Sequence, residues 1–172
     1  MSTDAPVTTT TAPADRPPVP PPASGDRRPP VGYRQRQRAL LVAVAVGGAC
    51  GAVARYAVSL ALPTAHGAFP WGTLTINLSG SALLGVLLAL LAEQFTRARL
   101  ARPLLGTGFV GAYTTFSTFA VEAVDLGRAG HWALAALYVV ASSMGGLAAV
   151  WAGMAVGRSL VRLEEWLRQE AA

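Results

Sequence analysis

The stretch "GFVGAYTTFSTF", residues 108–119, decides the fold because it places hydroxyl and aromatic side chains inside an apolar run. The run, Pro103 to Asp125, is long enough to cross a hydrocarbon core about 30 Å thick as a helix. Gly111 lowers helix propensity, and the β-branched Thr114 and Thr115 compete for backbone hydrogen bonds, so we expect this helix to be interrupted. Non-helical backbone at membrane depth persists only when buried in protein or facing a cavity, where freed carbonyls can coordinate a cation.

Three further apolar segments of spanning length accompany this run in the chain of 172 residues. They cover Ala39 to Leu62, Gly72 to Glu93 and His131 to Gly157. The chain is 52% hydrophobic and only 13% charged, which is unlike an average soluble domain. Because the polar residues show no period-2 pattern, helices rather than a barrel must satisfy the backbone in lipid. The sequence predicts an all-α membrane protein with four transmembrane helices in residues 39–157, the third of them broken.

Small residues recur at a spacing of four within these spans. The pairs are Gly47 and Gly51, Ser81 and Gly85, Ser142 and Gly146, and Gly153 and Gly157. Such residues let helices approach closely where lipid supplies no hydrophobic drive of its own, so we expect these positions to form helix contacts.

The two ends of the chain differ in composition from the spans. Residues 1–38 are rich in Pro, Thr, Ser and Ala and predict a disordered leader, whose length also argues against a cleaved signal peptide. Residues 158–172 combine spaced leucines and a tryptophan with charges. This tail either extends the fourth helix or lies along the cytoplasmic membrane interface.

Basic charge is distributed unevenly about the predicted spans. All 14 basic residues are arginines, and the formal net charge is +5. Only Arg128 lies in the loops on one side, whereas nine arginines flank the spans on the side that holds both termini: Arg34, Arg36, Arg38, Arg97, Arg99, Arg102, Arg158, Arg162 and Arg168. We therefore expect a multi-pass protein of the cell inner or plasma membrane with both termini in the cytoplasm. This topology accounts for the charge without a nucleic-acid partner.

Polar side chains within spans are costly in lipid, which makes each one a candidate for function. In the second span Thr73 and Asn77 share one helical face, as Tyr138 and Ser142 do in the fourth. For Asn77 the structural alternative is a hydrogen bond between helices. Arg55 in the first span either reaches the outer interface or forms a vestibule that attracts anions.

Phe116 and Phe119 stand three residues apart on one face, beyond the expected break. Aromatic residues at this spacing commonly serve packing alone. Here Ser117 and Thr118 lie between them, and the positive ring edges together with hydroxyl donors suit a small, hard anion that sheds its water. Because four helices enclose little space, we expect the pathway to form where at least two subunits meet.

Three segments of the chain resemble a family of known function. The segments "GGACGAVARY", "GTLTINLSGSALLG" and "GFVGAYTTFSTF", all within residues 39–157, resemble the fluoride ion channels called Fluc or CrcB proteins. The resemblance implies passive export of cytoplasmic fluoride through an antiparallel, dual-topology dimer of four-helix subunits. It also implies a structural sodium ion held by the backbone carbonyls of Gly111 and Thr114. Ala112 departs from the family, which usually has a second glycine there.

Site residues are implied by the same resemblance. Phe116 and Phe119 then line the fluoride path, and Asn77 donates a hydrogen bond to the ion. The polar residues that accompany them are Thr73, Ser117, Thr118, Tyr138 and Ser142. Glu122 also matches a polar position of the family, with a solvated span edge as the alternative.

The arginine distribution bears on the partner subunit. Identical chains that insert in both orientations need a nearly balanced distribution, whereas here nine flanking arginines oppose Arg128 alone. The family's homodimer is one arrangement. The bias predicts a fixed orientation instead, and hence a heterodimer with an oppositely oriented homologue.

The rival function is that of a small, proton-coupled multidrug transporter with four helices. Such a transporter needs a titratable carboxylate deep in a span, whereas Glu93 and Glu122 lie near predicted span ends. A scaffold without transport would need no polar stripe. An enzyme is the least favoured class because no nucleophile, base and orienting group form a recognisable motif, and the lone Cys50 has no second thiol.

Overall fold

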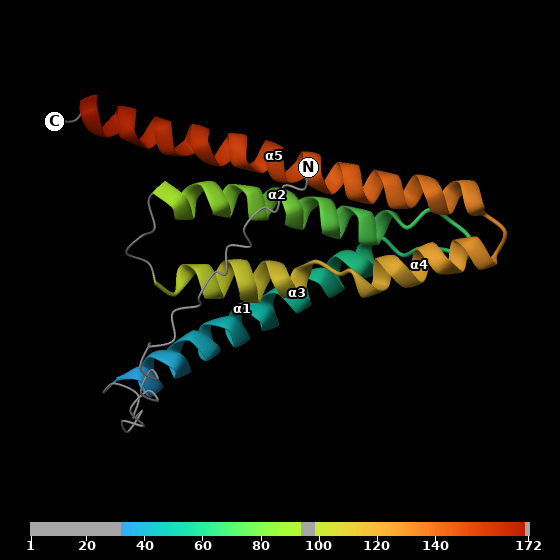
Figure 1. Cartoon of the computed structure of the whole chain (residues 1–172), viewed down its shortest axis with the longest axis horizontal. Helices are drawn as coiled ribbons and strands as arrows, with labels where there is room; N and C mark the ends of the chain where they lie inside the picture. The colour runs from blue at the N-terminus through green and yellow to red at the C-terminus, as the bar shows by residue number, and fades with distance from the viewer. Residues whose placement is uncertain (1–31, 94–98, 171–172) are drawn as a thin grey trace, which may run out of the picture. The chain divides into compact units, whose positions relative to one another are not determined.

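The structure is a computed structural model that describes residues 32–93 and 99–170, which belong to one compact unit. Every element within these residues is a helix (Figure 1). They are α1 (Tyr33–Ala61), α2 (Trp71–Glu93), η1 (Arg102–Val110), α3 (Gly111–Tyr113), α4 (Ser117–Arg128) and α5 (Trp132–Glu170). Of the predicted leader, residues 1–31 lie outside the described residues.

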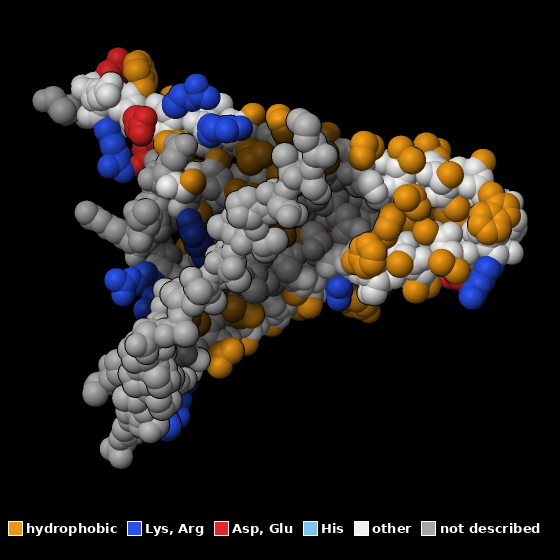
Figure 2. Space-filling view, in the orientation of Figure 1, with side chains coloured by type: hydrophobic (Ala, Val, Ile, Leu, Met, Phe, Trp, Pro, Cys, Tyr) orange, Lys and Arg blue, Asp and Glu red, His pale blue; other side chains and the backbone are white. Residues whose placement is uncertain are grey.

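Four helical segments are long and apolar enough to cross a membrane: Arg34–Ala61, Trp71–Ala92, Arg102–Arg128 and Trp132–Glu170. This confirms the all-helical class and the four predicted spans. Many large apolar side chains on these segments are exposed, and Figure 2 shows them over α4 and the adjoining part of α5. Exposed apolar surface on a spanning helix is what contact with lipid requires.

The first and last helices are longer than the predicted spans. Helix α1 begins at Tyr33 rather than at Ala39, directly after Gly32, whose φ of 95° is a backbone conformation that glycine adopts without strain. The intervening arginines and glutamines are good helix formers, so composition alone placed this boundary too late. Helix α5 runs without a break for 39 residues to Glu170, so the tail extends the fourth helix.

Glycines set the distance between paired helices. Helix α1 packs along η1 and α3, and α2 packs along α5 (Figure 1). A Cβ on Gly47 would lie 2.0 Å from the carbonyl oxygen of Leu104, and one on Gly153 would lie 2.1 Å from that of Ala82. No side chain larger than hydrogen fits at these two positions without moving a backbone.

Replacing Gly47 by alanine is expected to lower the free energy of unfolding by about 3 kcal/mol, because α1 and η1 must separate to admit the methyl group. Gly48→Ala is the matched control, since its nearest neighbours would lie 3.9 Å from the new Cβ and helix propensity improves. The stability of both variants is measured by heating them in detergent and recording the loss of the monodisperse peak in size-exclusion chromatography. Equal stability of the two variants would contradict this packing.

Candidate functional site

The third span is not a continuous helix. Thr114 has an extended backbone, with φ −76° and ψ 159°, and separates α3 from α4. The amide of Thr114 donates to the carbonyl of Val110 at 3.0 Å, and beyond the interruption the amide of Ala120 donates to that of Phe116 at 2.9 Å. The π-helical η1 leads into this segment, a geometry that frequently accompanies functional sites.

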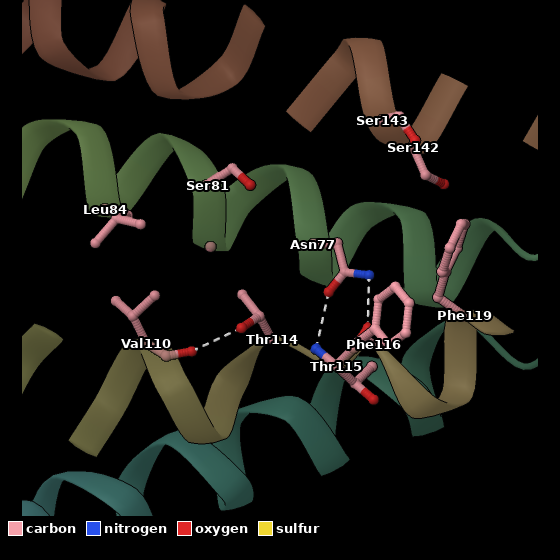
Figure 3. A pocket seen from close by; sticks show the side chains of 11 residues that line it. Asn77, Ser81, Leu84, Val110, Thr114, Thr115, Phe116, Phe119, Ser142 and Ser143 are labelled. Carbon is pink, nitrogen blue, oxygen red and sulfur yellow. Dashed lines mark hydrogen bonds between the residues drawn. The ribbon is translucent and has the colours of Figure 1, made fainter. Parts of the chain in front are cut away.

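Asn77 of α2 holds the interruption in place. Its Nδ2 donates to the carbonyl oxygen of Thr115 at 2.9 Å, and the amide of Thr115 donates to its Oδ1, also at 2.9 Å (Figure 3). Both backbone groups that a continuous helix would have paired are thus paired by one side chain. The interhelical hydrogen bond considered for Asn77 is present. Because an amide NH₂ carries two hydrogens, one remains for another acceptor.

Thr115 organises the start of α4. Its Oγ1 donates to Oγ1 of Thr118 at 3.0 Å and accepts from the amide of Thr118 at 3.3 Å. The hydroxyls of Thr115 and Ser117 are 3.4 Å apart. Thr115 was not among the residues predicted for the site, although a threonine where a helix resumes is a recognisable capping signal.

A cavity of about 350 Å³ opens between α2, α5 and the interruption (Figure 3). It brings together five of the predicted site residues, namely Asn77, Thr114, Phe116, Phe119 and Ser142. The hydroxyl oxygen of Ser142 is buried, and within the described part of the chain it has no hydrogen-bond partner. Other residues that line the cavity were not predicted as site residues: Gly80, Ser81, Leu84, Val110, Thr115 and Ser143.

Aromatic rings stand at one end of this cavity. The ring centroids of Phe116 and Phe119 are 5.8 Å apart with the planes tilted by 46°, and Phe119 lies 5.2 Å from the ring of Tyr138. Phe116 is 79% exposed in the single subunit. Its ring therefore contributes little to the core of its own subunit.

Glu122 of α4 receives two hydroxyl groups from other helices. Oγ1 of Thr73 donates to Oε1 at 2.9 Å, and the hydroxyl of Tyr138 donates to Oε2 at 2.7 Å. Thr73 and Tyr138 are buried, and neither lines the 350 Å³ cavity. Glu122 also borders a second cavity of about 240 Å³, beside the loop between α1 and α2. The Glu122 carboxylate is half-buried and accepts two hydrogen bonds, which differs from the solvated position at a span edge that was considered for this residue.

Comparison with known proteins matches residues 42–154 to the family described as CrcB-like protein, Camphor Resistance (CrcB). The chain belongs to the CrcB-like protein family. The resemblance drawn from the three sequence segments is therefore confirmed. With four helices of spanning length, this family member is a multi-pass membrane protein.

Curated relatives of this CrcB-like chain carry the name of an ion channel and not of an enzyme. Fluoride-specific ion channel FluC 3 of Streptomyces avermitilis is 45% identical over 127 residues, 73% of this chain and 62% of the relative, so less than two thirds of that relative is spanned. Fluoride-specific ion channel FluC of Saccharophagus degradans is 44% identical over 122 residues, 71% of this chain and 92% of the relative. The fluoride-specific ion channel FluC of Magnetococcus marinus is 45% identical over 116 residues, which is 67% of this chain and 94% of the relative.

The remaining predicted site residues of this CrcB family member lie outside both cavities. Arg55 is half-buried in α1, and Ser117 and Thr118 are exposed on α4. Gly111 is exposed at the start of α3. Their roles stay predictions.

Proposed function

We propose that the chain is a subunit of a fluoride-selective channel that exports cytoplasmic fluoride passively. The observation that carries the proposal is the cavity in which the Phe116 and Phe119 rings meet the amide of Asn77 and the buried hydroxyl of Ser142. Ring edges and neutral donors attract an anion less tightly than a charged side chain would, so the ion can leave again. Membership of the CrcB-like family and the names of the relatives support fluoride as that anion.

Passive flow suffices for export. Hydrogen fluoride enters cells as a neutral acid and dissociates in a less acidic cytoplasm. A membrane potential that is negative inside then drives the anion outward by about 2.3 kcal/mol per 100 mV. Several weak donors along the path serve conduction better than one strong site, because the ion must leave as readily as it enters.

Fluoride efflux from liposomes tests the proposal. Vesicles that contain the purified chain, alone or with an oppositely oriented homologue, should release fluoride much faster than protein-free vesicles and should retain chloride. Proton-coupled multidrug transport is the alternative, and Glu122 is the carboxylate on which it would depend. The absence of fluoride release in both preparations, together with drug uptake driven by a pH gradient, would favour that alternative.

A structural sodium ion at the interruption is part of the proposal. Among the described residues, the carbonyls of Gly111 and Thr114 accept no hydrogen bond, since the amides of Thr115 and Thr118 donate to side chains. Unpaired carbonyl oxygens are ligands that suit an alkali cation, and two from each of two subunits would supply four. The Ala112 methyl group removes neither carbonyl. The ion would supply a fixed positive charge that joins the subunits.

Thermal unfolding in sodium against potassium or an organic cation tests this site without reference to transport. A ligand that binds only the folded dimer raises its melting temperature with concentration. We expect sodium to raise the melting temperature and the other cations to leave it unchanged. Identical melting curves in all three salts would remove sodium from the proposal.

The partner is proposed to be an antiparallel homologue. The arginines at the start of α1 and the end of α5 lie at one end of the helices, and Figure 2 shows basic side chains gathered there. This asymmetry supports a single orientation with both termini in the cytoplasm. Tags on both termini report the orientation in cells. Comparable amounts of tag on both sides of the membrane would instead support the homodimer.

A further inference from the structure

Hydroxyl groups on the helices of this chain commonly donate to a backbone carbonyl one turn earlier. This bond satisfies a hydroxyl that would otherwise be costly in lipid. The residues whose hydroxyl oxygen makes this bond, at 2.6 to 3.0 Å from the carbonyl oxygen, are Ser59, Ser79, Thr114 and Ser159. A half-buried hydroxyl that does not make it needs another explanation.

The hydroxyl of Ser81 on α2 does not make this bond to a backbone carbonyl one turn earlier. Its side chain is half-buried and lines the 350 Å³ cavity, with the hydroxyl turned toward the end where Asn77 lies (Figure 3). In the part of the chain that the structure describes, this hydroxyl makes no hydrogen bond. Ser142 on α5 borders the same cavity, and its buried hydroxyl likewise has no hydrogen-bond partner among the described residues.

Packing between α2 and α5 does not explain the hydroxyl of Ser81. The tight contact lies one turn further along, where a Cβ on Gly85 would be 2.2 Å from the carbonyl oxygen of Val150. At Ser81 the contact is looser, since a Cβ on Gly146 would be 3.6 Å from the hydroxyl oxygen. Nothing in this contact requires an oxygen atom at position 81.

The position of Ser81 continues a line of polar residues. Thr73, Asn77 and Ser81 follow one another at intervals of four and therefore share a face of α2. The line runs from the end of α2 near Trp71 toward the end near Glu93. Ser81 is its innermost member, beyond Asn77 and opposite the space left by Gly146.

We propose that Ser81 belongs to the fluoride pathway and donates its hydroxyl to the ion on the Glu93 side of Asn77. This inference rests on the proposed channel function and adds a donor at a position whose spacing predicted only helix packing. With Ser142 across the cavity, the ion would be passed between hydroxyls of α2 and α5 before or after it meets the amide of Asn77. Several such weak positions in series are what conduction requires.

Fluoride efflux from liposomes with Ser81→Ala tests the inference. Removing a hydrogen bond to a charged group should slow efflux about tenfold, at the lower end of the expected range because water can take the place of the hydroxyl. Ser81→Thr keeps the donor and should retain most of the flux. Ser59→Ala is the matched control, because that hydroxyl is already bonded to the carbonyl of Tyr56 and lies outside the cavity.

Gly146→Ala provides a second variant that leaves Ser81 unchanged. The new methyl group makes an ordinary contact with the Ser81 hydroxyl, so the protein should fold, but it fills the space beside that donor and should also slow efflux. Wild-type flux in both Ser81→Ala and Gly146→Ala would overturn the role of Ser81 and leave the proposed channel function standing. Absence of flux from the wild-type protein, both alone and with the oppositely oriented homologue, would overturn the channel function and, with it, this inference.

Discussion

Phe116→Ile is expected to reduce fluoride efflux about 100-fold, comparable with the loss of one donor from a site that stabilises an anion. Isoleucine keeps an apolar side chain but has no ring edge to offer the ion. Because Phe116 is 79% exposed in its subunit, the free energy of unfolding should change by no more than about 0.5 kcal/mol. Efflux from liposomes and thermal unfolding in detergent measure the two quantities on the same preparation.

Phe109→Ile is the matched control for the ring. Phe109 stacks on Tyr113 with centroids 5.9 Å apart and packs against a buried cluster from α2 and η1, and its ring is not part of the cavity. This variant should lose about 1 kcal/mol of stability and keep its flux, which is the reverse of Phe116→Ile. Full flux in both Phe116→Ile and Phe119→Ile would remove the ring edges from the mechanism.

Asn77→Leu is expected to abolish measurable flux and to lower the free energy of unfolding by about 2–4 kcal/mol. Leucine has a similar volume but leaves the amide and carbonyl of Thr115 unpaired within the membrane, and each unpaired group costs about 1–3 kcal/mol. The remaining amide hydrogen that could meet the ion is lost as well. Flux and thermal unfolding again provide the readouts.

Thr75→Leu is the control for Asn77→Leu, because Thr75 is exposed on the same helix, two residues away. It should leave both stability and flux close to wild type. If Asn77→Leu proved as stable as Thr75→Leu, the two hydrogen bonds would not be what holds the interruption. Normal flux in Asn77→Leu would remove Asn77 from the proposed pathway.

Contacts between distant segments account for most of the site that sequence reasoning missed. Thr73 and Tyr138 were placed on the fluoride path as separate polar positions, yet in the structure both donate to Glu122. The bond from Thr73 joins residues 49 apart, so no local spacing could predict it. The bonds to Glu122 were not predicted, because distance from the span centre does not reveal which helices cover a side chain.

The sequence alone determined the helical class, the number of spans and the family. Hydropathy over some 20 residues reports the transfer of a whole helix into lipid, and the quoted segments carry the family's pattern. It also paired Phe116 with Phe119, because residues three apart share a helical face. These properties are local along the chain, and they depend little on how the helices pack.

Only the tertiary structure decided which groups meet across helices. Asn77 pairs with the backbone of Thr115, 38 residues away, and Ser81 faces the cavity although its spacing indicated packing. Both outcomes depend on the rotation of α2 about its axis, which is set by close contacts such as that of Gly85 with the Val150 carbonyl. A weak helix former permits an interruption, but a partner on another helix must satisfy the freed backbone groups, and that partner is a property of the fold.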